Sequence, residues 1–445
     1  MGTSGAVTGP VLAESAALCA RMAPWRRVST QFPRLGLADP AGTLRERLRA
    51  HHFEGTEGAG GIWPGATVAI AVGSRGISGL PGLVRAVADF VRERGASPVV
   101  VPAMGSHGGG TPAGQLEVLA ALGVSEASMG CPVRADAGTE LVGTVEGIDV
   151  HLSRYVVREV DAVIPVARVK PHTDFRGRVE SGVLKMLAVG LGQHAGADSL
   201  HRVPPAEFSA AVEAVGTFVL GAVAVPLSVA VVEDAYDQVA MVEVLGPGEL
   251  LEREVELLVE ARSLMPRLPF AEADILIVQE LGKNISGTGM DPNITGRYYR
   301  PTPSDASVGR VVTLELTHET HGNACGVGMA DIVTRRLADG IDWRSTYTNE
   351  VAARMLEGAR LPLVAEDDED AIGIALHSLG KRDPEAARIA WIRNTLAAAE
   401  LWVSEPLWNE LDDRDRLVTR GEPTPPSFVN GRLVLPSEDE LGRRS

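Results

Sequence analysis

The chain has only three cysteines in 445 residues, Cys19, Cys131 and Cys325, and more than a hundred positions separate each from the next. This spacing excludes a disulfide framework and a Cys-x-x-Cys metal site. It is typical of a protein in a reducing compartment, so we expect a cytoplasmic location.

Basic residues are also in the minority. The chain has 42 lysines and arginines and 58 acidic residues, so its formal net charge is -16. A protein that neutralises a phosphate backbone carries the opposite sign. We therefore expect no nucleic-acid partner.

Long apolar segments are lacking. Residues 214–232 carry no charge, but Gly216, Gly221 and Pro226 interrupt them, which predicts a buried helix followed by a strand. The N-terminal residues have no basic segment before their mildly apolar stretch, unlike a secretory signal. We expect no association with a membrane.

Lysine is the scarcest of the charged residues. Only four of the 42 basic residues are lysines, namely Lys170, Lys185, Lys283 and Lys381. Arginine is the ordinary cation of this chain, so a retained lysine indicates a site that needs a compact amine. Such an amine can lose its proton and act as a nucleophile, which a guanidinium cannot do.

The length and the 45% hydrophobic content predict two globular domains. From residue 66 onward, strand-like runs alternate with helix-like segments, which indicates an α/β fold with a mostly parallel, Rossmann-like sheet in the N-terminal domain. We assign residues 1–268 to this domain and residues 269–445 to a smaller α/β C-terminal domain. The active site is expected in the cleft between them.

In a parallel sheet, ligands bind at the loops outside the carboxyl ends of the strands. Arg75 follows the first predicted strand and could hold a carboxylate at two points. His107 follows the second strand and precedes three glycines. The third loop has the most charged and titratable side chains, namely Lys170, His172, Asp174, Arg176, Arg178, Glu180 and Lys185.

Other motifs carry less weight. Lys283 lies on a glycine-rich loop after a strand in the second half, where it could face a ligand. The His-Glu-Thr-His run at 318–321 lacks the HExxH spacing that puts two metal ligands on one helical face. The G-x-G-x-x-G fingerprint is absent after the first strand, which disfavours a nicotinamide cofactor.

Three motifs in order carry a family resemblance. They are Gly-Ser-His at 105–107, Ser-Gly-x-x-Lys at 181–185, and His201 sixteen residues after Lys185. Together they resemble the signature of the nickel-dependent lactate racemases and their relatives, over most of residues 60–205 and more loosely over the C-terminal half.

The resemblance implies a nickel-pincer nucleotide, a pyridinium mononucleotide whose thioamide and thiocarboxylate arms hold nickel. Lys185 would bind this cofactor covalently and His201 would complete the nickel coordination, for which imidazole is a suitable ligand. His107 and His172 would be the paired acid/base residues, and Arg75 and Lys283 would bind the substrate.

The same resemblance implies a racemase or epimerase of a 2-hydroxy acid. The Cα hydrogen leaves as hydride, a bound 2-keto acid forms, and return of the hydride to the opposite face inverts the centre. The expected partners are the substrate and the separate enzymes that make the cofactor and insert nickel.

This chain departs from the family pattern around the substrate. Val72 stands where the racemases have the aspartate of their Asp-x-Thr-Arg-Pro motif, and Gly108 follows His107 in place of an arginine. We therefore expect the cofactor to be kept and the substrate to differ from lactate. Arg176 and Arg178 suggest a second anionic group on that substrate.

Two other functions stay open at this point. The same histidines could bind zinc or iron for a lyase or hydrolase reaction without any nucleotide, in which case Lys185→Arg would have no effect. Alternatively, the chain could be a non-catalytic protein that binds the cofactor or a hydroxy acid, in which case binding would survive removal of His107 and His172.

Overall fold

The computed structural model describes residues 9–51, 61–136, 138–299, 302, 306–411 and 416–436. The chain forms two compact units, Pro33–Met265 and Met1–Phe32 together with Pro266–Ser445. The division at residue 268 had assigned residues 1–32 to the N-terminal domain. It was wrong for the described residues up to Phe32, because strand β1 (Trp25–Thr30) pairs with strands from the end of the chain.

The unit Pro33–Met265 contains a five-stranded sheet. Its strands, in spatial order, are β3 (Ser97–Pro102), β2 (Thr67–Val72), β6 (Ala162–Arg168), β7 (Ser228–Glu233) and β8 (Val239–Leu245). The first four run parallel and β8 is antiparallel to β7. The predicted mostly parallel sheet is thus confirmed, and its continuous apolar runs are those of strands buried on both faces.

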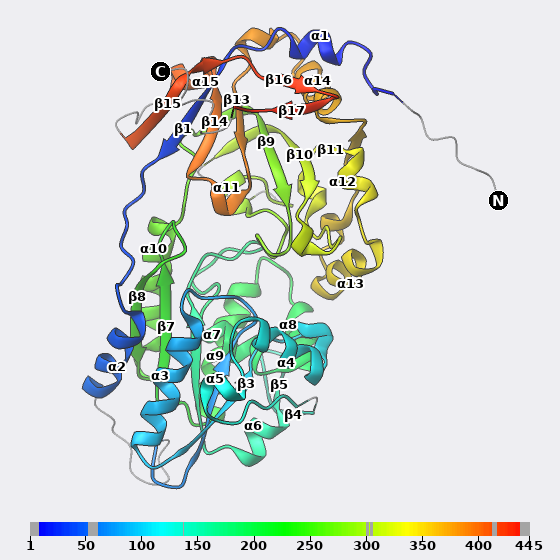
Figure 1. Cartoon of the computed structure of the whole chain (residues 1–445). Coiled ribbons are helices and arrows are strands. Elements are labelled where there is room, and N and C mark those ends of the chain that lie inside the picture. Colours follow the sequence, from blue (N-terminus) through cyan, green and yellow to red (C-terminus); the bar gives the residue numbers. More distant parts are fainter. Residues whose placement is uncertain are drawn as a thin grey trace, which may run out of the picture. The chain divides into compact units, whose positions relative to one another are not determined.

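Helices and one hairpin surround this sheet (Figure 1). The helices are α2 (Pro40–Ala50), α3 (Leu80–Glu93), α4 (Pro112–Ala121), α5 (Glu126–Met129), α6 (Arg154–Glu159), α7 (Val183–Lys185), α8 (Gln193–His201), α9 (Phe208–Ala222) and α10 (Leu250–Leu264). A 3-10 turn, η1 (Gly108–Gly110), precedes α4, and a π-helical turn, η2 (Met186–Gly190), continues α7. Strands β4 (Thr139–Val145) and β5 (Ile148–Ser153) form the hairpin.

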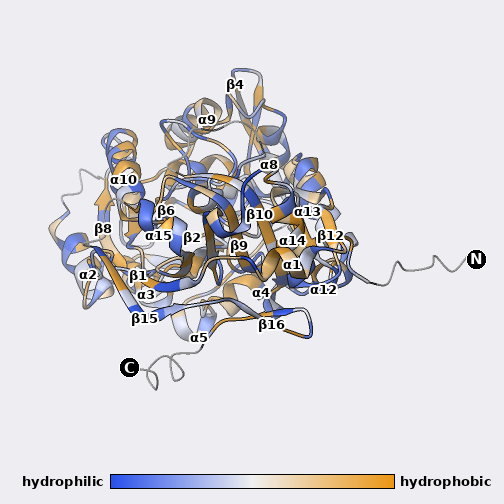
Figure 2. Ribbon diagram, turned by 90° about the horizontal axis from the view of Figure 1, so that it is seen from above, coloured by the Kyte–Doolittle hydropathy of each residue, from blue (hydrophilic) through white to orange (hydrophobic). Residues whose placement is uncertain are grey.

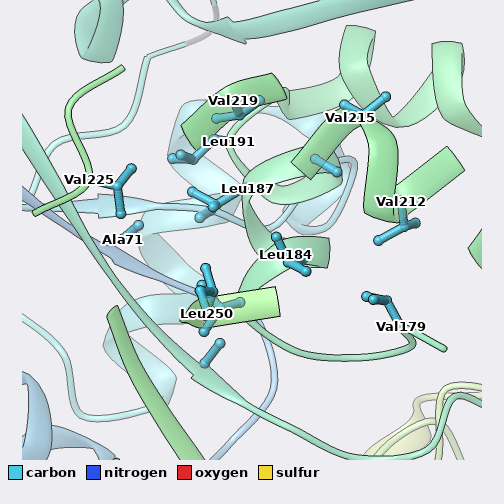
Figure 3. Packing of buried hydrophobic residues seen from close by; sticks show 14 of the residues in the cluster. Ala71, Val179, Leu184, Leu187, Leu191, Val212, Val215, Val219, Val225 and Leu250 are labelled. Atoms are coloured by element: carbon cyan, nitrogen blue, oxygen red, sulfur yellow. The ribbon is translucent and has the colours of Figure 1, made fainter. Parts of the chain in front are cut away.

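The two faces of the sheet carry separate hydrophobic clusters. Val68, Ile70 and Val72 point into one of them, while Ala69 and Ala71 point into the other, as the two-residue period of a strand requires. The second cluster also receives three fully buried leucines of the α7–η2 segment, Leu184, Leu187 and Leu191 (Figure 3). Burial of each leucine stabilises the fold by roughly 1.5–3 kcal/mol, so the segment that carries Lys185 is firmly anchored.

The other unit contains an eight-stranded sheet. Strands β12, β11, β10, β9 and β13 run parallel, and β14, β1 and β15 continue the sheet in antiparallel pairs. Their bounds are β9 (Glu272–Leu281), β10 (Ser307–Leu316), β11 (Ile332–Thr334), β12 (Leu363–Ala365), β13 (Ile389–Ile392), β14 (Glu400–Ser404) and β15 (Leu417–Thr424).

Short helices cover this second sheet. The longer ones are α13 (Trp343–Ala353) and α14 (Asp368–His377), and the others are α1 (Ser15–Cys19), α11 (Pro292–Thr295), α12 (Arg335–Asp339) and α15 (Glu405–Glu410). Strands β16 (Ser427–Val429) and β17 (Arg432–Val434) form a hairpin. The hydropathy colouring shows hydrophobic residues along β10 (Figure 2), where Val311, Val312 and Leu314 are fully buried. Within the described parts of the chain, no helix has the length and apolar character that crossing a membrane requires.

Candidate functional site

Three loops that carry candidate residues start at one edge of the five-stranded sheet. Strand β2 lies between β3 and β6 and is parallel to both, so the loops after Val72, Pro102 and Arg168 leave the same edge. Arg75 lies on the first loop, and His107 lies on the second. The third loop carries His172 and leads into α7, which ends at Lys185.

A buried amide pair joins the second loop to the start of α8. Gln115 Nε2 donates to Gly105 O at 3.1 Å and to Gln193 Oε1 at 2.7 Å. Gln193 Nε2 donates in turn to Pro102 O at 3.0 Å, at the end of β3. These hydrogen bonds therefore tie the second loop to α8, the helix that ends at His201.

Buried Glu180 organises the third loop. Its carboxylate accepts hydrogen bonds from His172 N at 2.6 Å and from Gly177 N at 3.2 Å, and it forms an ion pair with Arg262 of α10. The loop closes where Lys170 and Ser181 exchange backbone hydrogen bonds of 3.1 and 3.2 Å. The backbone at His172 is thus fixed by a carboxylate that water does not reach.

The ring of His172 is held in one orientation. Its Nδ1 accepts a hydrogen bond from Asp174 N at 3.0 Å, and the ring stacks on Phe175 with centroids 4.3 Å apart. In the neutral ring the proton is then on Nε2, which is a donor. In the other tautomer the proton is on Nδ1 and Nε2 can accept one, and Asp174 Oδ2, 3.7 Å from Nδ1, is then the carboxylate beside that proton.

The charge state of His172 follows from its surroundings. Burial lowers the pKa of the imidazole well below 6.5, and the cations of Lys185 and Arg75 lower it further. The side chain still has 18% of its surface exposed. His172 is therefore a neutral imidazole at pH 7 that a small molecule can reach.

Lys185 has an amine suited to nucleophilic chemistry. Burial lowers its pKa to about 8, with Asp174 opposing this effect and Arg75 adding to it. Its Nζ lies 5.4 Å from the centre of the Phe175 ring. Near pH 8 about half of the amines are neutral, so they carry the lone pair that a covalent bond requires.

A second buried carboxylate holds the helix that ends at Lys185. Glu254 of α10 accepts from Val183 N at 2.6 Å and from Leu184 N at 3.3 Å. A Cβ on Gly182 would lie 2.6 Å from Glu254 Cδ, so only glycine leaves room for the carboxylate. Burial raises the pKa of Glu254 to about 7. Sequence reasoning missed this residue, which lies 71 positions from Val183.

His201 ends α8 and joins a row of aromatic rings. Its ring centroid is 5.6 Å from that of Phe208, which is 4.8 Å from that of Phe175. Two phenylalanines thus lie between His201 and His172, and Lys185 lies over one of them. Neither phenylalanine was singled out from the sequence.

Arg75 and His107 are both exposed. The charge of Arg75 acts on His172 and on Lys185, which brings these three side chains into one electrostatic site. The loop of His107 packs on α8, since a Cβ on Gly110 would lie 3.7 Å from His194 Cβ. The loop that carries one predicted acid/base residue therefore lies against the helix that ends at His201.

The glycines after His107 have a packing role. Gly108 has a φ of +65°, and a Cβ on it would lie 2.6 Å from Gln115 N. The missing side chain allows the loop to close onto the first turn of α4, where Thr111 caps Gly114 N. The packing of this loop against α4 therefore accounts for a glycine at position 108, and no ligand is needed to explain it.

The two arginines that suggested a second anionic group on the substrate are engaged by the protein. Arg176 donates to His172 O at 2.5 Å and lies 3.6 Å from the Glu180 carboxylate. Arg178 pairs with Glu213 at 2.7 Å and with Glu252 at 2.5 Å. These contacts support loop structure, so the geometry gives no support to a dicarboxylate substrate.

Lys283 belongs to the other compact unit, directly after β9. Its Nζ donates to Asn349 Oδ1 of α13, and its backbone N donates to Thr320 Oγ1 at 3.0 Å. Cys325 lies nearby, and its thiol donates to buried Glu350 at 2.9 Å. Burial raises the pKa of this thiol to about 12 despite the opposing charge of Lys283, so the thiol is chemically inert near pH 7.

His201 and Lys185 are compatible with a metal group that brings its own ligands. Within the described ranges, no three His, Cys, Asp or Glu side chains are grouped closely enough to hold an ion. A site formed by protein ligands alone normally uses three or four of them. A group with its own sulfur and carbon donors needs only one imidazole, which His201 can supply, and a nucleophilic amine such as Lys185 for its attachment.

Known proteins offer limited comparison. No family model matches the chain, and no curated protein matches it. The structure of the lactate racemase apoprotein from Thermoanaerobacterium thermosaccharolyticum is similar, with a TM-score of 0.48 and 14% identity over 83% of this chain and 99% of that one. A crystal structure of a protein from Thermotoga maritima is similar with a TM-score of 0.49 and 12% identity, over 82% and 98% of the two chains.

Proposed function

We propose that the chain is a racemase or epimerase of a 2-hydroxy acid that uses a nickel-pincer nucleotide. The observation that carries this proposal is the grouping of Arg75, His172 and Lys185 at one edge of the parallel sheet. A neutral imidazole, an amine with a low pKa and an arginine lie within electrostatic range of one another. The ordered motifs around His107, Lys185 and His201 add to it.

Two residues would hold the cofactor. Lys185 would form the covalent link through its neutral amine, and His201 would provide the imidazole ligand to nickel. When bound, the group supplies a hydride acceptor beside the substrate Cα. The row of rings from His172 to His201 gives this region an apolar wall.

The remaining residues would act on the substrate directly. Arg75 would bind the carboxylate and fix the orientation of the hydroxyl group. His172 would accept the hydroxyl proton at Nε2 in its other tautomer, in which the ring proton lies on Nδ1 beside the Asp174 carboxylate. His107 would perform the same task for the opposite enantiomer, because inversion requires an acid/base group on each side of the carbon.

The test is loss of optical rotation across a panel of 2-hydroxy acids. The protein is co-expressed with the enzymes that make the cofactor and insert nickel. We expect racemisation of at least one acid, and a drop of about 10²- to 10⁴-fold in kcat for His172→Ala. His377→Ala is the matched control, since His377 is exposed and pairs with Glu14, and it should keep full activity.

Two results would contradict the proposal. One is nickel-loaded protein that racemises no acid in the panel. The other is a His172→Ala variant that retains the activity of the control.

A further inference from the structure

The four lysines of the chain allow one amine to be compared with the rest. Lys185 has its Nζ over the ring of Phe175, at 5.4 Å from the centroid, and its backbone is held by Glu254 through the first turn of α7. The residue is nevertheless partly exposed. The amine thus has a defined position over the ring, in a residue that is not fully buried.

The groups around this amine suit a small anion with a carbonyl group. Arg75 lies within electrostatic range of Lys185, and both Arg75 and Lys170 act on the adjacent His172. An arginine binds a carboxylate at two points. A 2-oxo acid held in this way would place its carbonyl carbon one bond from the anchored carboxylate, within reach of the neighbouring amine.

We propose that the nucleotide-free chain forms an imine between Lys185 and a 2-oxo acid. The lone pair of Nζ attacks the carbonyl carbon, a C–N bond forms, and the electrons of the C=O double bond move to oxygen, which takes a proton. The carbinolamine then loses this oxygen as water while the C=N bond forms. Both protons that leave with this oxygen as water come from Nζ, and His172 Nε2–H can hydrogen-bond to the oxygen during their transfer, so the step needs no oxidant or reductant.

The low pKa of Lys185, about 8, supports this geometry. Near neutral pH it leaves far more neutral amine than a lysine with an ordinary pKa of about 10.4 would have. Burial beside another cation is also the means by which lysines are activated for imine formation.

This reaction goes beyond the proposed racemase activity and does not need nickel. Both use the same amine, so a bound 2-oxo acid would compete with attachment of the nucleotide. The two proposals fail separately, because imine formation is measured on protein made without the cofactor-making enzymes.

The experiment uses pyruvate as the probe. Full-length protein is incubated with pyruvate and borohydride, which reduces the imine to a stable amine, and the modified lysine is found by peptide mass spectrometry. We expect Lys185 to be labelled about tenfold or more above Lys283 and Lys381 at pH 7. The labelling of Lys185 should rise with pH and level off above about 8.

Two controls separate specific from general reactivity. Acetone has the carbonyl group without the carboxylate, so it should lose most of the preference for Lys185. Arg75→Gln should reduce labelling by pyruvate more strongly than labelling by acetone, because it removes the carboxylate anchor as well as a charge that lowers the pKa of Lys185. Similar labelling of all four lysines, absence of label from Lys185, or an equal preference with acetone would overturn the proposal, and all three are read from wild-type protein.

Discussion

Lys185 and Lys283 are the same residue type, and each lies in a segment that follows a parallel strand, yet their surroundings differ. Lys185 lies over an aromatic ring, beside a neutral histidine and within range of a second cation. Lys283 donates to the Asn349 amide, close to a buried glutamate and an inert thiol. The first environment disfavours a charged amine, whereas the second gives it a fixed hydrogen-bond partner. The neighbours therefore decide which lysine can act as a nucleophile.

Replacing each lysine in turn by arginine tests most directly whether the two lysines differ as nucleophiles. In protein loaded with the cofactor, Lys185→Arg should abolish the covalent adduct, because a guanidinium cannot form the link. Lys283→Arg should leave the adduct in place. The measurement is the mass of the peptide that contains position 185. An adduct that survives Lys185→Arg, or disappears with Lys283→Arg, would contradict the account.

The support of Lys185 can be tested through Glu254→Gln. The pKa of Glu254 is raised from 4.5 to about 7 in the folded protein, so the folded state binds more protons than the unfolded state between these values. Its contribution to stability is complete below pH 4.5 and is lost as the pH rises to about 7, by about 3 kcal/mol. The glutamine variant lacks this loss.

The free energy of unfolding of both proteins, measured with denaturant at pH 4.5 and pH 7, checks this prediction. The difference between variant and wild type should shift in favour of the variant by most of that amount at the higher pH. A difference that is equal at both pH values would show that Glu254 does not titrate as described.

The contact between Gly182 and Glu254 gives a smaller effect. Gly182→Ala places a methyl group 2.6 Å from Glu254 Cδ and should destabilise the fold by about 1–3 kcal/mol. Gly221→Ala is the matched control, because Gly221 lies in α9 with nothing within 4 Å of a Cβ. It should stabilise the helix by about 0.5–1 kcal/mol. Equal effects in thermal unfolding would rule out the close contact.

The smallest expected effect concerns the charge of Arg75 and the reactivity of Lys185. Arg75→Gln removes a cation that lowers the pKa of Lys185, so this pKa should rise and the amine should be less reactive. We expect acetic anhydride to label Lys185 about threefold more slowly at pH 8. Arg85→Gln should leave the rate unchanged, since Arg85 pairs with Asp89 on α3. A rate that Arg75→Gln does not alter would remove Arg75 from the site.

The local pattern of the sequence predicts the parallel sheet and the edge at which its loops gather. The apolar runs of β2, β3 and β6 and the helical spacing of α3 were sufficient for this. The position of β1 could not be predicted, because its partners β14 and β15 lie more than 370 residues further along the chain. A single strand carries no signal of which sheet it joins.

The candidate site shows the same limit. Arg75, His172 and Lys185 were found from their loops, because residues after adjacent parallel strands meet at one edge. Glu180 was noted on the third loop, but its contact with His172 N was not predicted, and Glu254, Phe175 and Phe208 were missed as site residues. Their roles depend on tertiary contacts, such as that from Glu254 to Val183, which neither periodicity nor composition encodes.

The most direct test of the central claim is the metal content of protein that has been co-expressed with the cofactor-making enzymes. Elemental analysis should find near-stoichiometric nickel in the wild type and in His194→Ala, a control on the same helix. In His201→Ala the nickel should be lost. Zinc, iron or no metal in all three proteins, or nickel that persists in His201→Ala, would contradict the account.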